Sequence, residues 1–161
     1  EKTDQAMSDS FMAGVLNRMR DITIFLNTTK DSYQRFGENE APKYITWSTQ
    51  NRSRLMRVPI ERGERSGFIL RSPDSELNPY LAFAMIIQAG LCGIRRGEKL
   101  PDPVEKNIHL SDGTERESFE KLPLSLTEAI EWASSSDFLK EANVMDIAAR
   151  FVDMAAHRDN P

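Results

Sequence analysis

The sequence predicts an α+β fold in which a small antiparallel sheet is flanked by helices. Three observations lead to this class: a helical apolar period over residues 11–26, three short alternating segments between residues 43 and 71, and a strongly apolar helix that starts near residue 78. The chain has 161 residues, a length typical of one domain that buries its own core without disulfide bonds.

The first predicted helix covers residues 11–26. Its apolar residues recur at spacings of four, four and three from Phe11 to Ile22, which places them on one face. We expect the charged residues between them, including Arg18 and Asp21, to lie on the solvent side. The polar segment that follows residue 26 predicts a loop.

Three short segments alternate between apolar and polar residues and predict strands. They lie at residues 44–48, 55–58 and 68–71, with polar connections between them. Short alternating segments of this kind are typical of an antiparallel sheet.

Asn78 and Pro79 predict the start of the longest apolar helix, because Asn caps a helix and Pro suits its first position. The helix is apolar on nearly every side as far as Ile94, so we expect it to run through a core. A capping box at residues 125–128 predicts a short helix, and apolar spacing over residues 144–155 predicts a last one.

Composition excludes several classes of protein. With 21 Lys and Arg against 25 Asp and Glu, the net charge is −4, which disfavours general binding to nucleic acid or anionic membranes. The single Cys92 excludes an internal disulfide and a cysteine-rich zinc site, and it suits a reducing compartment. Residues 80–94 are too short for a membrane span, and no secretory signal is visible at the N-terminus. We therefore expect a cytoplasmic location.

Arginines are concentrated in one part of the chain. Residues 51–71 contain six arginines and two acidic residues, a local charge of +4. Arginine binds carboxylates and phosphates through two parallel hydrogen bonds, so an anion site is one interpretation. A solvated face with surface ion pairs is the second, and a nucleic-acid patch that uses Tyr44 and Trp47 for stacking is the third.

Seven short motifs then resemble, in order and spacing, those of the bacterial type I glutamine synthetases. They are Ser32-Tyr-Gln-Arg-Phe36, Glu40-Ala-Pro42, Trp47-Ser48, Asn51-Arg-Ser53, Arg57-Val-Pro59, Leu70-Arg-Ser-Pro-Asp74 and Asn78-Pro-Tyr-Leu-Ala-Phe83. The resemblance extends from about Phe11 to Asn107, well over half of the chain.

This resemblance implies a ligase that uses ATP and Mg²⁺ to join glutamate and ammonia through γ-glutamyl phosphate. Residues 1–110 would be the C-terminal portion of the catalytic domain, and residues 111–161 a helical extension of it. The family's ATP segment and most of its metal carboxylates precede this portion, so the isolated fragment is expected to be inactive. Its expected partners are the N-terminal half of a parent chain and the homo-oligomeric rings of the full-length enzyme, with no nucleic acid and no membrane.

The resemblance also assigns roles to five residues. Arg35 and Arg71 would bind the carboxylates of glutamate, and Arg57 would hold ATP phosphate. Arg52 would lie between glutamate and the γ-phosphate, contacting both in a catalytic role. Glu40 would close over the substrate and help to deprotonate ammonium. No metal ligand is assigned to this chain.

Two positions of the third predicted strand depart from the family. Gly67 stands where the family has Arg, and Ile69 stands where the family has a Glu that binds the metal at the ATP phosphates. Isoleucine offers no oxygen ligand to Mg²⁺. Two interpretations follow: a ligase in which water occupies the coordination position, or a degenerate protein with a binding or assembly role. His109 stands near a tyrosine that some members adenylylate, so that control is not expected.

Overall fold

The computed structural model describes residues 2–38, 41–51, 54–59, 67–105, 117–142 and 144–158. In chain order the described elements are α1 (Lys2–Asn17), α2 (Met19–Leu26), α3 (Lys30–Gln34), β1 (Trp47–Ser48), β2 (Met56–Arg57), β3 (Ile69–Leu70), α4 (Pro79–Arg96), α6 (Leu126–Ser135), α7 (Asp137–Glu141) and α8 (Met145–Arg158). The proposed division at residues 110 and 111 lies outside the described residues.

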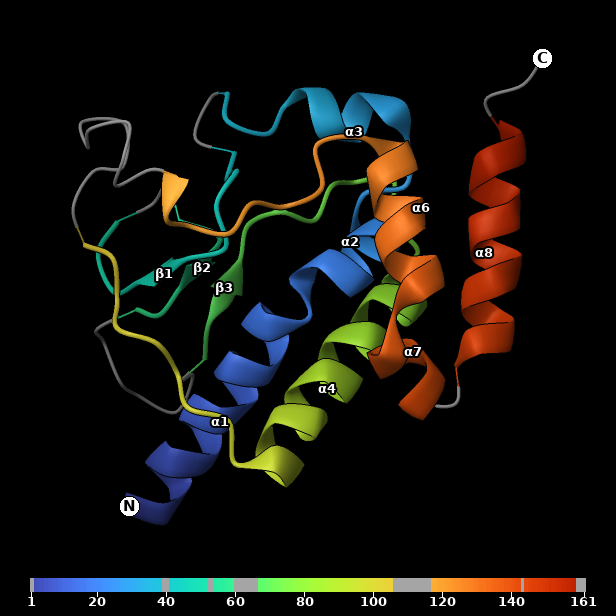
Figure 1. Cartoon of the computed structure of the whole chain (residues 1–161). Coiled ribbons are helices and arrows are strands. Elements are labelled where there is room, and N and C mark those ends of the chain that lie inside the picture. The colour runs from blue at the N-terminus through green and yellow to red at the C-terminus, as the bar shows by residue number, and fades with distance from the viewer. Residues whose placement is uncertain are drawn as a thin grey trace.

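Helices and sheet occupy different sides of the molecule. Figure 1 shows α1 and α4 side by side through the middle, the small sheet on one side of them, and α6, α7 and α8 on the other. The predicted α+β class is therefore confirmed. Among the described residues, no helix combines the length and hydropathy that a membrane crossing requires.

The sheet is mixed, so the prediction of a purely antiparallel sheet is wrong in one pairing. Strands β2 and β3 are antiparallel, but β1 and β2 are parallel, with Ser48 opposite Arg57. The Ser48 hydroxyl accepts hydrogen bonds from the backbone N–H groups of Gln50 and Asn51, which turns the chain directly after β1. Strand β2 lies beside β1 and runs in the same direction.

The predicted helix over residues 11–26 is two helices, α1 and α2, which meet at Arg18. Arg18 is buried, so its expected place on the solvent side is wrong. Its guanidinium donates to the carboxylate of Glu98 at 2.6 Å and 2.9 Å, and to the carbonyl oxygen of Gly14 at 3.1 Å. Arg18 can be buried because the carboxylate of Glu98 neutralises its charge. Glu98 follows α4 and is far from Arg18 in the sequence.

Small residues allow α1 and α4 to approach closely. A Cβ atom at Gly93 would lie 2.2 Å from the carbonyl oxygen of Ser10, and one at Gly14 would lie 2.4 Å from that of Ala89. Phe11 fills the space beside Gly90. This backbone contact makes α1 and α4 one rigid layer.

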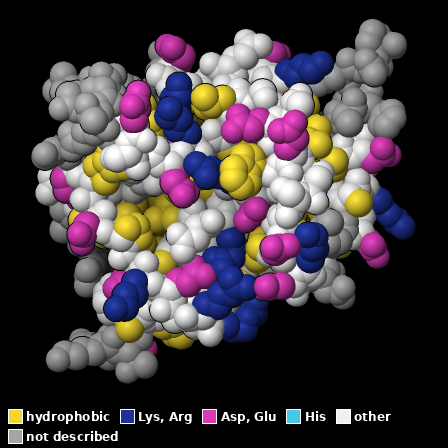
Figure 2. Space-filling model, in the orientation of Figure 1, with side chains coloured by type: hydrophobic (Ala, Val, Ile, Leu, Met, Phe, Trp, Pro, Cys, Tyr) yellow, Lys and Arg dark blue, Asp and Glu magenta, His cyan; other side chains and the backbone are white. Residues whose placement is uncertain are grey.

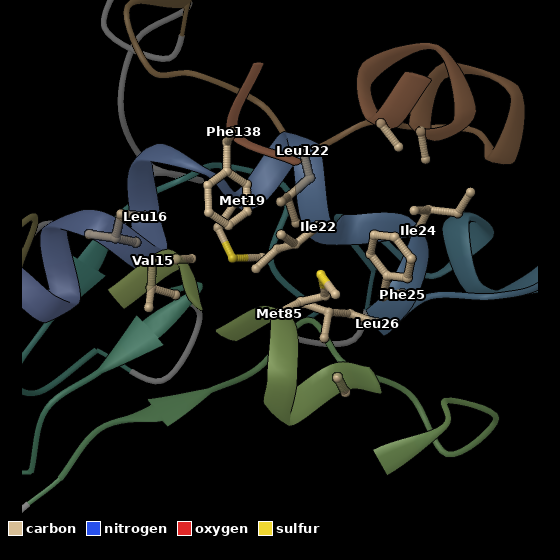
Figure 3. Packing of buried hydrophobic residues seen from close by; sticks show 14 of the residues in the cluster. Val15, Leu16, Met19, Ile22, Ile24, Phe25, Leu26, Met85, Leu122 and Phe138 are labelled. Atoms are coloured by element: carbon tan, nitrogen blue, oxygen red, sulfur yellow. The ribbon is translucent and has the colours of Figure 1, made fainter. Parts of the chain in front are cut away.

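The core lies between this layer and α2, α6 and α7. Figure 3 shows Met19, Ile22 and Met85 grouped in the interior, with Phe138 beside Met19. The ring of Phe25 contacts that of Phe151 on α8, with centroids 5.2 Å apart. The core therefore joins helices from both ends of the chain.

Local capping explains where three helices begin. The Asn78 side chain accepts from the N–H groups of Tyr80 and Leu81, as the sequence predicts for α4. The Ser125 hydroxyl accepts from the Glu128 N–H at the start of α6, also as predicted. The short α3 begins with a capping box between Thr29 and Ser32, inside the segment expected to be a loop.

Helix α4 is not surrounded by the core, contrary to its apolar sequence. Its buried face includes Ala82, Met85 and Ala89, whereas Tyr80 and Phe83 on another face are exposed. Apolar composition on every side indicates burial only where packing partners exist.

Candidate functional site

One face of the sheet carries two arginines next to an apolar residue. Arg57 on β2 lies directly opposite Ile69 on β3, and the Arg71 N–H donates to the carbonyl oxygen of Leu55 at 2.9 Å. Because side chains alternate along a strand, Ile69 and Arg71 share a face with Arg57, which lies directly opposite Ile69 and diagonal to Arg71. Position 69 therefore has an arginine as a neighbour on each of the two strands.

A third arginine joins them from α3. Arg35 follows α3, and its guanidinium donates to the carbonyl oxygen of Ser72, the residue after Arg71. The same carbonyl accepts from the side-chain amide of Asn27 at 2.8 Å. One peptide oxygen therefore fixes Arg35 relative to the segment that carries Arg71.

Tyr33 contributes a further hydrogen bond to this polar cluster. Its hydroxyl donates to the backbone carbonyl of Asn27 at 2.8 Å. Burial, with a smaller contribution from the carboxylate of Asp74, raises the pKa of Tyr33 above its ordinary value. The hydroxyl therefore stays protonated and keeps donating throughout the physiological range.

The opposite edge of the sheet is supported by a carboxylate. Glu105 accepts from the Ser48 hydroxyl at 2.5 Å, and from the Thr49 N–H and hydroxyl at 2.9 Å and 2.8 Å. Burial acts to raise the pKa of Glu105, but these hydrogen bonds hold it below its ordinary value. The adjacent Val104 carbonyl accepts from Nε of the buried Arg54 at 2.8 Å, and burial lowers the pKa of that guanidinium.

Buried polar atoms that lack hydrogen-bond partners gather at this end of the molecule. Within the described part of the chain they are Asn27 Oδ1, Arg35 Nε, Thr46 Oγ1, Arg54 Nη2, Arg57 Nε, Ser72 Oγ and Asp74 Oδ2. Each of these residues belongs to the sheet, its flanking segments, or the cluster around Ser72. A buried polar group without a partner costs about 1–3 kcal/mol, so such a concentration is typical of a site that ligands or further chain complete.

The donor set suits anions rather than cations. Three arginines present planar donors that match carboxylates and phosphates. In the same described residues, no group of three His, Cys, Asp or Glu side chains could hold a metal ion. The side chains described here therefore fit phosphate and carboxylate groups but do not by themselves fit Mg²⁺.

Figure 2 shows Lys and Arg side chains interspersed with Asp and Glu over the visible face. Arg20, for example, lies 3.8 Å from the carboxylate of Glu120 and stacks over the ring of Trp132. The mixed charges on this face do not form the continuous positive stripe typical of nucleic-acid binding.

Comparison with known families agrees with the geometry. The family model described as glutamine synthetase, catalytic domain, matches residues 1–159. The chain belongs to the glutamine synthetase family.

Several curated glutamine synthetases are similar to this chain. The protein of Methanosarcina mazei is 44% identical over 135 residues, which cover 82% of this chain and 30% of that protein. The protein of Thermotoga maritima is 41% identical over 152 residues, covering 92% and 34%. The protein of Staphylococcus aureus strain MW2 is 40% identical over 146 residues, covering 89% and 33%. The chain thus spans about a third of the length of these relatives.

A solved structure described as the GmaS/ADP complex in conformation 1 has the same fold. It superposes with a TM-score of 0.81 at 25% identity and covers 94% of this chain and 35% of that one. This chain therefore adopts the fold of the matching third of that structure.

Only some of the residues predicted for the glutamine synthetase site lie in the described part. Arg35 and Arg71 are brought together through Ser72, and Arg57 lies on the same sheet face as Arg71. Glu40 and Arg52 lie outside the described residues, as does His109.

The two positions where the resemblance predicts departures from the family lie at β3 and shortly before it. Ile69 is 48% exposed beside the arginines, and a Cβ atom at Gly67 would have nothing within 4 Å. Both positions have room for longer side chains.

Sequence reasoning missed the residues that position the arginines. Nothing in the local sequence distinguishes Asn27, and Arg54 is one of the six arginines in residues 51–71. Asn27 and Arg54 act through partners 45 and 50 residues away, and sequence patterns do not reveal such distances. Only its place in the family motif Ser32-Tyr-Gln-Arg-Phe36 indicates a role for Tyr33.

Proposed function

We propose that this chain supplies the substrate-binding arginines of an ATP-dependent ligase that forms glutamine from glutamate and ammonia. In this reaction the γ-carboxylate of glutamate attacks the γ-phosphoryl group of ATP, giving γ-glutamyl phosphate and ADP. Ammonia then attacks the acyl carbon, and phosphate leaves. Each step moves negative charge between oxygens, so fixed cations are the chemistry that the protein must supply.

Arg35 and Arg71 bind the carboxylates of glutamate in this proposal. The shared Ser72 carbonyl sets the spacing between them, since Arg35 donates to it and Arg71 precedes it. Asn27 holds that carbonyl from the other side, so the pair is preorganised before glutamate arrives. Preorganised donors lose little entropy when they bind a ligand.

Arg57 binds phosphate oxygens of ATP. Its buried Nε lacks a hydrogen-bond partner, and its strand places it opposite Ile69, on the same face of the sheet as Arg71. A phosphate oxygen at this point would satisfy the unpaired donor and bridge the nucleotide to glutamate. This arrangement of Arg57, Ile69 and Arg71 is the observation that carries the proposal.

Glu40 and Arg52 complete the proposed chemistry from segments outside the described residues. Arg52 contacts glutamate and the transferred phosphoryl group, and Glu40 closes over the site and helps to deprotonate ammonium. Magnesium in this family neutralises phosphate charge, but the donors described here do not fit it, so no step is assigned to the metal on this chain.

The proposal also includes the rest of the enzyme that this site requires. Because the relatives are about three times as long, the isolated 161 residues are proposed to be inactive. Activity then requires the N-terminal half of a parent chain, assembled in homo-oligomeric rings in the cytoplasm.

Position 69 favours a second candidate function. The exposed Ile69 stands opposite Arg57, at the position where the resemblance predicts a carboxylate. A degenerate protein that binds ligands or assembles without turnover would have such an apolar residue at this position.

A chimera separates the two candidates. The matched segment of the Thermotoga maritima glutamine synthetase is replaced by this chain, and phosphate release is measured with ATP, Mg²⁺, glutamate and ammonia. Three versions are compared: the unaltered chain, Gly67→Arg/Ile69→Glu, and Arg57→Met as a control for the arginine site.

The expected result is release by the unaltered chimera that requires both glutamate and ammonia, and its loss in Arg57→Met. Activity confined to the Gly67→Arg/Ile69→Glu version would support the degenerate protein instead. Assembled chimeras that are all inactive would contradict the ligase, with assembly checked by light scattering.

A further inference from the structure

Strand β1 fixes the position of Arg57 in the sheet. The Met56 N–H donates to the Thr46 carbonyl at 3.2 Å, and the Val58 N–H donates to the Ser48 carbonyl at 2.9 Å. These two amides flank Arg57, which lies directly opposite Ser48 in the parallel pairing of β1 with β2. The place of Arg57 along the sheet therefore depends on β1.

The other edge of β1 is held by the segment that follows α4. The Val104 N–H donates to the Trp47 carbonyl at 2.9 Å, and the Trp47 indole N–H donates to the Pro101 carbonyl at 2.7 Å. Because carbonyl groups alternate in direction along a strand, the Trp47 carbonyl points away from β2. Strand β1 therefore lies between β2 and residues 101–105.

Glu105 joins this segment to the end of β1 through its side chain. Its carboxylate oxygens accept from three donors on consecutive residues, which are the Ser48 hydroxyl, the Thr49 N–H and the Thr49 hydroxyl. The Ser48 hydroxyl in turn accepts from the N–H groups of Gln50 and Asn51. One exposed carboxylate thus holds both the end of a two-residue strand and the turn after it.

We propose that Glu105 is a positioning residue for phosphate binding, which acts by holding β1 beside the strand that carries Arg57. In this proposal Glu105 does not contact the phosphate. The inference rests on the proposed function, in which Arg57 binds ATP phosphate, and it adds the residue that keeps Arg57 in place. Strands of two residues form few ladder hydrogen bonds, so side-chain bonds at their ends contribute much of their order.

The direction of the effect separates positioning from a simple charge effect. A negative charge near a phosphate site repels the ligand, so removal of the Glu105 carboxylate would strengthen ATP binding if only its charge mattered. If Glu105 acts through β1, its removal weakens ATP binding instead. Because Glu105 is exposed, we expect its hydrogen bonds to act locally and to leave the global stability nearly unchanged.

Two measurements on Glu105→Ala test the proposal. The first is hydrogen exchange of the Val58 amide in the 161-residue chain, which reports the pairing of β1 with β2 without any ligand. The second uses the Thermotoga maritima chimera that carries this chain. There, calorimetry gives the Kd for ATP, and phosphate release gives the KM for glutamate. The matched control is Asp102→Ala, which removes an exposed carboxylate from the same segment.

In Glu105→Ala we expect the Val58 amide to exchange about tenfold faster and the Kd for ATP to rise about fivefold. The KM for glutamate and the unfolding temperature should stay nearly unchanged. Glu105→Gln keeps one acceptor oxygen without the charge, so it should fall between Glu105→Ala and the unaltered chain. Asp102→Ala should match the unaltered chain.

Unchanged exchange of Val58, or tighter ATP binding in Glu105→Ala, would overturn the proposal. A lower unfolding temperature with equal weakening for ATP and glutamate would also overturn it, because Glu105 would then only stabilise the fold. An unaltered chimera that binds no ATP would refute the role of Arg57 and this proposal with it. An absence of phosphate release, together with weaker ATP binding in Glu105→Ala, would contradict the ligase and support the positioning role.

Discussion

The helical layer and the arginine end of the sheet are built in opposite ways. Helices α1 and α4 meet at glycines with backbone in contact, and the buried Arg18 beside them is fully engaged by Glu98 and Gly14. At the sheet, strands are two residues long, and buried atoms of Arg35 and Arg57 lack partners. One region is arranged for stability, and the other retains unsatisfied donors that suit a ligand.

The energetic cost of the site and the packing that offsets it therefore lie in different regions of the molecule. Unpaired buried donors destabilise a fold, so a second region must offset them. The rigid α1–α4 contact and the core in Figure 3 are placed to do this. Substitutions in the helical layer should therefore lower stability more than ligand binding, and substitutions at the arginine end should lower ligand binding more than stability.

The largest effect is expected from Gly93→Ala in the helical layer. The new Cβ would meet the carbonyl oxygen of Ser10 at 2.2 Å and Cα of Gly14 at 2.5 Å, and both are backbone atoms that cannot rotate away. We expect a loss of about 3 kcal/mol in the free energy of unfolding, measured by urea denaturation. Gly67→Ala, where no atom lies within 4 Å, is the control and should change it by less than about 0.5 kcal/mol. Equal effects would show that the close helix contact is not rigid.

A smaller loss is expected from Glu98→Gln, which leaves the buried Arg18 without its anion. We expect about 2 kcal/mol at pH 7. The hydrogen bond from Arg18 holds the pKa of Glu98 below its ordinary value, so its contribution is present above about pH 4.5 and is lost as pH falls through the folded pKa. Unfolding measured from pH 7 to pH 3 should show a shallower acid slope for Glu98→Gln than for the unaltered chain. Parallel slopes would contradict the pairing.

Asn27→Ala tests the cluster that joins the two regions. It removes one of two donors to the Ser72 carbonyl, and Arg35 still donates to that oxygen. Because Asn27 Oδ1 lacks a partner, the expected loss is moderate, about 1–2 kcal/mol by thermal unfolding. Gln34→Ala, which removes an exposed amide bound to Asp31, should cost less than about 0.5 kcal/mol. A loss no greater than that of the control would mean that Asn27 does not hold the arginine segment.

The smallest effect on stability is expected from Arg57→Met. Its buried Nε gives the fold no hydrogen bond, so its replacement by an apolar side chain should change the free energy of unfolding by less than about 0.5 kcal/mol. Arg18→Met, at a paired cation, should cost about 3 kcal/mol under the same conditions. Similar losses at the two arginines would remove the distinction between the regions.

Local signals in the sequence predicted much of the fold. Asn78 and Ser125 begin helices because a cap acts on residues two or three positions away. Alternation located all three strands, but the parallel pairing of β1 with β2 is a tertiary contact, which alternation does not encode. The break at Arg18 was invisible for the same reason, since Glu98 is 80 residues away.

The candidate site was only partly predictable. Family motifs selected Arg35, Arg57 and Arg71, and a period of two places the last two on one face. Their support by Asn27 depends on tertiary contacts that no motif contains. Likewise, the apolar sequence of α4 gave no indication of which face would remain exposed.

Native-state hydrogen exchange of the unaltered chain is the most direct test of this division. Amides of α4 between residues 85 and 93 should exchange only through global unfolding. The sheet amides of Val58 and Arg71, which donate to Ser48 and Leu55, should exchange at least a hundredfold faster through local opening. Equal protection of the two sets would contradict it, because the sheet would then be as stable as the helical layer.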